Sequence, residues 1–275
     1  MKNNGLVSIC IPTYNGEKHL KQTLESVLSQ DYENIEIIVA DDVSSDLTEE
    51  IVKSFDDSRI KYFKNTKRLG LGENWNNVVS KASGEYIKLL CQDDILFDRA
   101  ISAQVKALQE NPTASCCIGN TTVIDENGKQ VMKRFRFKKA KLVNGKKFAK
   151  KSFIGRNIYA EPANLMYRQR YFEILGGYDT SLKYTIDWDF AIQLSCLGNV
   201  YCIDAPIMSF RVNSTSETSR LYSQKDKYLI KDTMKLIDKH IKLKQLNLNL
   251  FNKFLFYLTT KLMMIIRGIV LKLHN

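Results

Sequence analysis

The chain reads L-L-C-Q-D-D from Leu89 to Asp94, and this stretch is the most informative part of its sequence. It places two adjacent carboxylates, Asp93 and Asp94, directly after an apolar run of the length of a buried strand. Hard divalent cations such as Mg²⁺ and Mn²⁺ bind one or two protein carboxylates and complete their coordination with substrate phosphates. A solvated strand end would also carry such a pair, so the interpretation needs a second observation.

A second acidic pair, Asp41-Asp42, follows another apolar run, Ile35–Ala40. In open α/β sheets, ligands bind outside the carboxyl ends of the strands. Two strands that both end in paired acids therefore favour one shared site for a ligand that carries phosphate.

Strand-like and helix-like segments alternate through the first 110 residues, which is the pattern of βαβ units around a mostly parallel sheet. Beyond Pro112, two strand-like segments joined by the turn residues 125–128 predict a hairpin and a mixed or antiparallel second half. The expected strands are 6–11, 35–40, 60–63, 86–90, 114–124 and 129–137, and the expected helices are 17–30, 72–83 and 98–110.

Composition is that of an ordinary globular protein, with 44% apolar and 26% charged residues. The formal charge of +11 is uneven, because residues 221–275 carry eleven Lys and Arg against three Asp, which leaves +3 for residues 1–220. We therefore predict a catalytic domain over 1–220 and a basic helical extension over 221–275. The basic stretch 132–151 contains interleaved Phe, but a solvated strand or an acceptor-site loop explains it better than nucleic-acid binding.

The six cysteines lie mostly within apolar runs and show no C-x-x-C zinc spacing, which is typical of a reducing compartment. The first apolar run ends too early, at Pro12, to serve as a signal peptide. We therefore expect the catalytic part to face the cytosol.

Three segments together resemble the family 2 glycosyltransferases and occur in that family's order and spacing. The resemblance covers about residues 6–215. It implies an α/β fold of the glycosyltransferase-A type, with a Rossmann-like mixed sheet flanked by helices. It also implies a nucleotide diphosphate sugar as donor, with UDP favoured, a Mg²⁺ or Mn²⁺ cofactor and inversion at the anomeric carbon. The three segments are S-I-C-I-P-T-Y-N at 8–15, I-I-V-A-D-D-V-S-S-D at 37–46 and L-C-Q-D-D at 90–94.

The resemblance assigns the donor nucleotide to residues near the first two strands. Pro12 and Tyr14 would pack on the base, and Asp42 would accept a hydrogen bond from a base N–H group. Arg68 precedes the sequence G-L-G and is expected to contact the diphosphate. Val43 stands where the family more often has Gly, so we expect this turn to avoid a positive φ.

The metal motif of the family, often D-x-D-D, corresponds to the stretch that ends at Asp94. The resemblance makes Asp94 the metal ligand and places Asp93 at the ribose or as a second ligand, while Cys91 replaces the first acid. Arg211 and Asn213 are further candidates for contact with the diphosphate, although the family often has His at the position of Asn213.

A general base must remove the proton of the acceptor hydroxyl as it attacks the sugar. The family carries this base after a G-G-[YF]-D segment, and G-G-Y-D at 176–179 is followed here by I-D-W-D-F at 186–190. Asp187 therefore aligns with the base, and the alternative is a helix-capping acid. The segment E-P-A-N-L-M-Y-R at 161–168 occupies the acceptor side, or is a plain core strand.

The segment 250–273 is apolar but is interrupted by four cations, which fall on one arc of a helix. This pattern predicts an amphipathic helix that lies on a membrane surface, so residues 245–275 would dock the protein on the inner face of the plasma membrane beside a glycan or lipid-linked glycan acceptor. The alternatives are packing on the catalytic domain or on a second subunit in a homodimer. The expected apolar face carries Leu255, Leu258, Leu262, Ile266, Ile269 and Leu273.

Other classes of protein fit less well. A nucleotidyltransferase would carry a Gly-rich phosphate loop near its N-terminus, and an oxidoreductase would need the third glycine that G-L-G at 70–72 lacks. A degenerate, non-catalytic nucleotide-sugar binding module is the remaining alternative, based on Cys91, Val43, Ile186 and Asn213. The retained acids Asp42, Asp93, Asp94 and Asp187 argue against this alternative, so we expect an active transferase, and its expected role is cell-surface polysaccharide synthesis.

Overall fold

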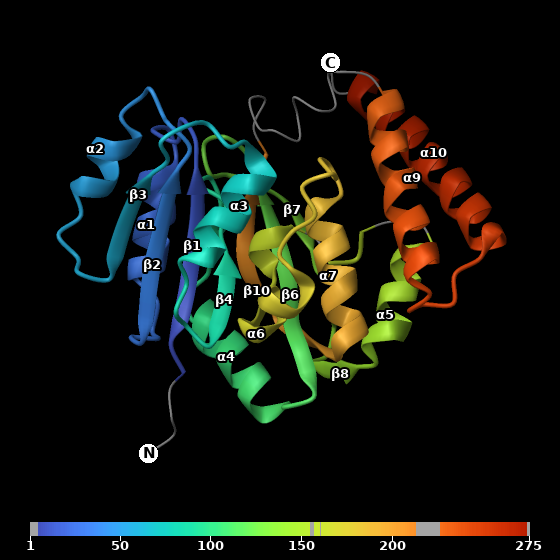
Figure 1. Cartoon of the computed structure of the whole chain (residues 1–275). Helices are drawn as coiled ribbons and strands as arrows, with labels where there is room; N and C mark the ends of the chain where they lie inside the picture. The colour runs from blue at the N-terminus through green and yellow to red at the C-terminus, as the bar shows by residue number, and fades with distance from the viewer. Residues whose placement is uncertain (1–4, 155–156, 160, 213–225, 274–275) are drawn as a thin grey trace.

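The computed structural model describes residues 5–154, 157–159, 161–212 and 226–273 (Figure 1). A ten-stranded sheet forms the centre, with strand order β3-β2-β1-β4-β9-β6-β10-β5, and β7 and β8 pair with β6 and β10. The strands are β1 (Val7–Thr13), β2 (Ile35–Asp41), β3 (Ile60–Lys64), β4 (Tyr86–Leu89), β5 (Ile95–Leu96), β6 (Ala114–Ile124), β7 (Gln130–Arg134), β8 (Lys141–Val143), β9 (Met166–Arg168) and β10 (Asn199–Arg211).

The sheet has the predicted division into a parallel and a mixed half. β1 pairs in parallel with both β2 and β4, and β2 pairs in parallel with β3. β9, β7, β8 and β5 join antiparallel, while β6 and β10 are parallel. The predicted hairpin between β6 and β7 is confirmed, and its turn closes where Gly128 N–H donates to the carbonyl of Asp125 at 3.1 Å.

Helices cover both faces of the sheet, which explains why β1, β2 and β4 are apolar almost throughout. Ile9 and Ile11 of β1 face the layer of α1 and α4, whereas Cys10 faces the opposite layer with α3, α5, α6 and α7. The helices are α1 (Leu20–Leu28), α2 (Thr48–Lys53), α3 (Leu71–Ser80), α4 (Ala100–Glu110), α5 (Gly145–Ser152), α6 (Arg170–Leu175), α7 (Ile186–Leu197), α9 (Asp226–Leu243) and α10 (Leu250–Leu273), with a 3₁₀ turn η1 (Pro162–Asn164).

The basic extension forms two long helices, α9 and α10, which lie side by side and beside α7 and α5 (Figure 1). Leu236 and Ile237 of α9 and Phe256 of α10 belong to the same hydrophobic core as Trp188 of α7. The described part of 221–275 therefore shares its core with the catalytic part. Among the described residues, no helix combines the length and the apolar character needed to cross a membrane.

Candidate active site

The three motif segments meet at the carboxyl ends of β1, β2 and β4, as predicted from the order of the strands. Hydrogen bonds join the first segment to the third: Tyr14 N–H donates to Gln92 Oε1 at 2.8 Å, and Gln92 Nε2 donates back to the carbonyl of Tyr14 at 3.0 Å. Asn15 N–H donates to Ser44 Oγ at 2.9 Å. Pairing of three parallel strands thus places the 12–15, 41–44 and 90–94 segments at one edge of the sheet.

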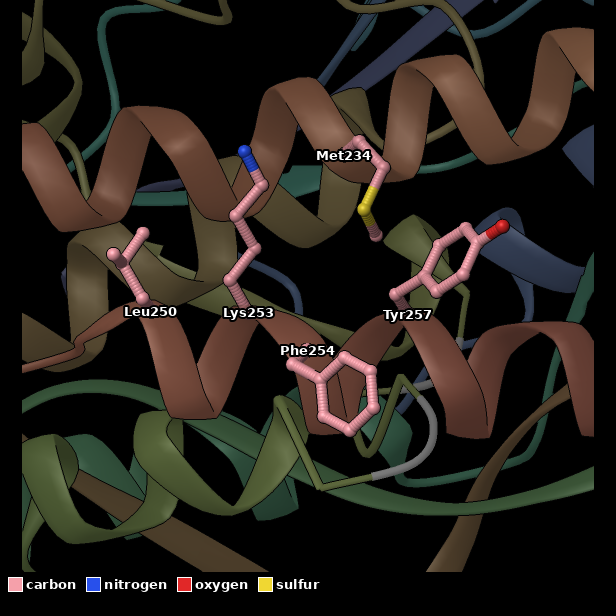
Figure 2. Close-up of a pocket in the computed structure, with 5 residues that line it drawn as sticks. All are labelled: Met234, Leu250, Lys253, Phe254 and Tyr257. Atoms are coloured by element: carbon pink, nitrogen blue, oxygen red, sulfur yellow. The ribbon is translucent and has the colours of Figure 1, made fainter.

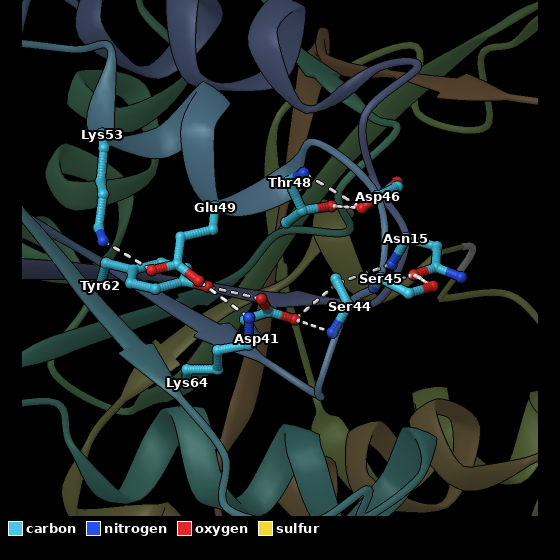
Figure 3. A network of polar contacts seen from close by, with 10 residues as sticks. All are labelled: Asn15, Asp41, Ser44, Ser45, Asp46, Thr48, Glu49, Lys53, Tyr62 and Lys64. Carbon is cyan, nitrogen blue, oxygen red and sulfur yellow. Dashed lines mark hydrogen bonds and ion pairs between the residues drawn. The ribbon is translucent and has the colours of Figure 1, made fainter.

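The turn after β2 adopts the conformation that we did not expect of Val43. Its φ is 64°, so the prediction that this turn avoids a positive φ is wrong. The reason is the polar network around Asp41, which accepts hydrogen bonds from the backbone N–H and hydroxyl of Ser44 and from the hydroxyl of Tyr62 (Figure 3). These bonds offset a left-handed strain of about 1–2 kcal/mol.

Asp42 is 3% exposed and accepts hydrogen bonds from the backbone N–H groups of Leu69 and Gly70, at 2.7 and 2.8 Å. These bonds fix the loop that leads into α3. As a result, the guanidinium carbon of Arg68 lies 3.5 Å from the ring centroid of Tyr14. The predicted donor residues are therefore neighbours, and Asp42 fastens the loop that carries one of them.

Asp94 is fully buried at the end of the β4 segment, and one of its carboxylate oxygens, Oδ2, has no hydrogen-bond partner among the described residues. Its Oδ1 accepts from the backbone N–H of Arg211 at 3.2 Å. Burial, together with the charge of Asp93, raises the pKa of Asp94 well above its usual range. An orphaned buried carboxylate oxygen is costly unless a ligand satisfies it, and an oxygen donor of this kind suits Mg²⁺ or Mn²⁺.

No group of three or more His, Cys, Asp or Glu side chains is arranged to hold a metal ion within the described ranges. A cation at Asp94 would therefore depend on Asp93 and on oxygens of a bound diphosphate. This matches the usual coordination of Mg²⁺ by one or two carboxylates plus substrate.

Arg211 has a different environment from the one expected for a diphosphate contact. Its side chain is 1% exposed, and its guanidinium donates to the carbonyls of Asp93 and Glu126, both at 3.0 Å, and to Gln22 Oε1 at 2.8 Å. It thus ties the acid loop to neighbouring segments, and a contact with phosphate would require these bonds to break. Asn213 lies outside the described residues.

Asp187 lies half-buried in the first turn of α7. Burial, reinforced by the charge of Glu161, raises its pKa to about 7. A general base works best when its pKa is near the working pH. The neighbouring Ile186, which replaces the family's usual Glu, is buried and packs near Gly72 of α3, where an added Cβ would lie 2.7 Å from the Ile186 side chain.

Sequence reasoning did not single out Glu161, although it noted the segment that begins there. Glu161 is 9% exposed and forms an ion pair with Arg134, and its second oxygen, Oε2, finds no hydrogen-bond partner within the ranges that the structure describes. Its charge raises the pKa of both Asp94 and Asp187, so it acts on the site from the predicted acceptor side.

A buried lysine holds the segment that carries Glu161. Lys88 is fully buried within β4, and its ammonium group donates to the carbonyl of Ala163 at 2.6 Å and to Gln104 Oε1 at 2.7 Å. Gln104 Nε2 in turn donates to the carbonyl of Asn164 at 2.9 Å. The one signal in the sequence was a lysine inside an otherwise apolar strand, Y-I-K-L.

A hollow elsewhere on the surface lies between α9 and α10, and the described residues that line it include no acid. Met234, Leu250, Lys253, Phe254 and Tyr257 line it (Figure 2). Its apolar character separates it from the acidic edge of the sheet, so it belongs to the surface of the helical extension.

The sheet order and the acids at its carboxyl edge are those of the glycosyltransferase-A fold. The fold is similar to that of S. aureus TarS 1-349 in complex with UDP-GlcNAc, with a TM-score of 0.71 and 18% identity over 90% of this chain and 69% of that chain. Residues 8–176 match the model of glycosyl transferase family 2. The chain therefore belongs to this family.

Relatives agree with this assignment. An uncharacterised glycosyltransferase of Methanocaldococcus jannaschii is 33% identical over 228 residues, which is 80% of this chain and 76% of the relative. A UDP-Glc:alpha-D-GlcNAc-diphosphoundecaprenol beta-1,3-glucosyltransferase of Escherichia coli is 38% identical over 122 residues, 44% of this chain and 48% of the relative. A GalNAc(5)-diNAcBac-PP-undecaprenol beta-1,3-glucosyltransferase of Campylobacter jejuni is 39% identical over 107 residues, 38% of this chain and 35% of the relative.

Proposed function

We propose that this glycosyltransferase is metal-dependent and inverting, and that it moves a sugar from a UDP-sugar to a hydroxyl of a glycan or lipid-linked glycan in cell-surface polysaccharide synthesis. The observation that carries the proposal is the buried Oδ2 of Asp94, which has no partner in the described part of the chain and lies at the carboxyl edge of the sheet in the same acidic site as Asp187. The undecaprenol-linked substrates in the names of the two glucosyltransferase relatives support the choice of acceptor.

The donor nucleotide binds against the Pro12–Tyr14 loop and the Arg68 loop. The base of the nucleotide stacks on the ring of Tyr14. Arg68 lies against the same ring, so its guanidinium is close enough to bind the diphosphate. Asp42 preorganises this side through its bonds to the Arg68 loop, in addition to the contact with a base N–H that the family resemblance implies.

Asp94 would hold a divalent cation, with Asp93 as the second ligand or the ribose contact. Mg²⁺ or Mn²⁺ bound there would supply the positive charge that offsets the charge developing on the diphosphate leaving group. The chain's contribution is a preformed acidic loop, which Arg211 holds in place from behind.

Asp187 removes the proton from the acceptor hydroxyl while that oxygen attacks the anomeric carbon. The new carbon–oxygen bond forms on the face opposite the diphosphate, the sugar–phosphate bond breaks with its electron pair on the diphosphate, and the configuration inverts. Glu161 keeps Asp187 basic enough for this step, because a nearby negative charge favours the protonated carboxyl group.

The test is turnover of a panel of UDP-sugars, measured by release of UDP with and without Mn²⁺ and EDTA. We expect Asp94→Ala and EDTA each to abolish release, and the exposed Asp98→Ala, four residues further on, to leave it unchanged. Release that persists in EDTA and in Asp94→Ala would refute the metal-dependent mechanism. UDP-sugar binding without any turnover would instead favour a non-catalytic binding module.

We further propose that the outer face of α10 docks on the cytoplasmic face of the plasma membrane, within the predicted segment 245–275. Phe251, Phe254, Leu258 and Leu262 follow one stripe of this helix and are 45–68% exposed. An apolar stripe on a basic helix is typical of interfacial binding. It agrees with the predicted face at Leu258 and Leu262, while Leu255 is half-buried and Ile266, Ile269 and Leu273 have no described side chains.

The membrane test uses point substitutions, because deletion of 245–275 would remove Phe256, which is 1% exposed and packs on Trp188 beside the base. We expect the double variant Phe254→Ser/Leu258→Ser to lose flotation with vesicles that contain phosphatidylglycerol. The matched control, Leu47→Ser/Ile174→Ser, removes apolar side chains of 59% and 62% exposure elsewhere and should float as the wild type does. Unchanged flotation of the α10 variant, with a change in sedimentation, would identify the stripe as a homodimer interface instead.

A further inference from the structure

We propose that α9 positions the general base: Asp232 binds the backbone at the N-cap of α7, and Lys239 and His240 hold its first turn from the side opposite Asp187. The C-terminal extension would then be part of the catalytic machinery rather than an appendage. This inference rests on the proposed function, because that function assigns the role of base to Asp187.

The first contact lies at the N-terminal end of α7, where a side chain of α9 binds the backbone that leads into the helix. The backbone N–H groups at the start of a helix have no partners within it, and Thr185, at the N-cap position of α7, makes no side-chain cap bond of its own. Asp232 of α9 is 3% exposed and accepts from the N–H groups of Tyr184 and Thr185, both at 2.9 Å, and from the Thr185 hydroxyl at 3.0 Å. The negative charge of the Asp232 carboxylate also interacts favourably with the partial positive charge at the N-terminus of α7.

The second contact lies on the back of the same turn. Residues two apart on a helix differ by about 200° around its axis, so Asp189 faces away from the side that Asp187 presents to the site. Asp189 is fully buried and binds Lys239 Nζ at 2.7 Å and His240 Nε2 at 2.9 Å, both from α9.

Neighbouring contacts limit the movement of this turn further. Lys239 Nζ also binds the carboxylate of Asp179 at 2.6 Å, and Asp179 ends the G-G-Y-D loop. Trp188, between the two acids, packs between the rings of Phe153 and Phe256, with centroid distances of 6.3 and 5.6 Å. The residues on both sides of Asp187 are therefore fixed by contacts that do not involve Asp187 itself.

The polar character of these contacts argues for positioning rather than for stability alone. Buried ion pairs stabilise a fold no better than apolar packing of the same size. Directional bonds to a carboxylate and to backbone N–H groups, however, limit both the rotation of a helical turn about the helix axis and its translation along that axis. Misplacement of a catalytic group by about 1 Å costs on the order of 100-fold in rate.

The experiment compares Asp232→Ala, which removes both acceptor oxygens, with Asp232→Asn, which keeps one. Asp238→Ala is the matched control, because Asp238 lies on the same helix, is 43% exposed and pairs with Lys253 at 2.6 Å on the surface. Three measurements are made on each full-length variant: hydrogen–deuterium exchange of the amides of 183–190, the number and affinity of UDP sites by calorimetry with Mn²⁺, and kcat with the best UDP-sugar of the panel.

We expect Asp232→Ala to speed exchange across 183–190 and to lower kcat by about 10- to 100-fold, with UDP affinity and one site per chain retained. Asp232→Asn should recover part of both losses, and Asp238→Ala should match the wild type. Retained UDP binding separates misplacement of the base from general unfolding, because unfolded chains would lower the number of sites.

Two results would overturn the inference: exchange in 183–190 that is the same for Asp232→Ala and Asp238→Ala, or faster exchange with a wild-type kcat. A wild type that turns over no UDP-sugar would instead overturn the proposed function and with it the role of the base. The exchange measurement would still decide in that case whether α9 holds the first turn of α7.

Discussion

The substitution Asp187→Asn tests the general base through two properties at once. The pKa of Asp187 rises from its ordinary 3.8 to about 7 in the folded chain, and one pKa unit corresponds to about 1.36 kcal/mol. A shift of about three pKa units therefore means that ionisation of this carboxyl group lowers the free energy of unfolding by roughly 4 kcal/mol. Asn keeps the shape and cannot ionise, so the substitution should stabilise the fold while it removes the base.

The sign of the effect follows from linkage. When folding raises the pKa of an acid, the acid costs no stability at a pH below its unfolded pKa, where it is protonated in both states. The free energy of unfolding then falls as the pH rises from the unfolded pKa to the folded pKa. For Asp187 the loss accumulates from about pH 4 to about pH 7. We expect Asp187→Asn to raise the free energy of unfolding by up to about 4 kcal/mol at pH 8 and by less than half of that at pH 5. We expect turnover to fall about 10²- to 10⁴-fold.

The assay is urea unfolding at pH 5 and pH 8 in EDTA, together with release of UDP from the best UDP-sugar. Asp189→Asn is the control, because it makes the same chemical change two residues away at a buried carboxylate paired with Lys239 and His240. We expect Asp189→Asn to lower the free energy of unfolding by about 3 kcal/mol, whereas Asp187→Asn should raise it. If Asp187→Asn destabilises the protein at pH 8 or retains turnover, Asp187 is a structural acid and the assignment of the base is wrong.

Three further predictions concern the donor site, the β2 turn and the extension. Arg68→Ala should weaken UDP binding about tenfold, or about 1.4 kcal/mol, in calorimetry, because the diphosphate loses its guanidinium; Lys67→Ala is the control and an equal loss there would contradict a specific contact. Val43→Gly should raise the free energy of unfolding by about 1 kcal/mol, since glycine adopts the φ of 64° without strain, and a lower urea midpoint would refute this. Phe256→Ala should cost about 3–5 kcal/mol in urea unfolding, whereas Phe254→Ala, which is 59% exposed, should stay within about 0.5 kcal/mol; similar values for the two would place α10 outside the core.

Much of the fold was predictable because it depends on local periodicity. The alternation of strand and helix through residue 110 and the hairpin after β6 both appear where the sequence indicated them. The two acidic pairs also lie at one edge, because parallel strands bring their carboxyl ends together. Helix α1 is shorter than predicted, at Leu20–Leu28 instead of 17–30, since periodicity does not define where the first and last turns close.

By itself, the sequence determined the order of strands and helices through residue 110, the acids that follow the strands and the family, because these depend on residue type, spacing and order. Only the tertiary structure decided how distant groups change one another. Glu161 raises the pKa of Asp187, the guanidinium of Arg211 donates to the loop that carries Asp93, and α9 binds the first turn of α7 through Asp189. Desolvation and hydrogen bonding of this kind depend on which groups are buried together. The partners here are separated by tens of residues or more along the chain, so no local pattern records them.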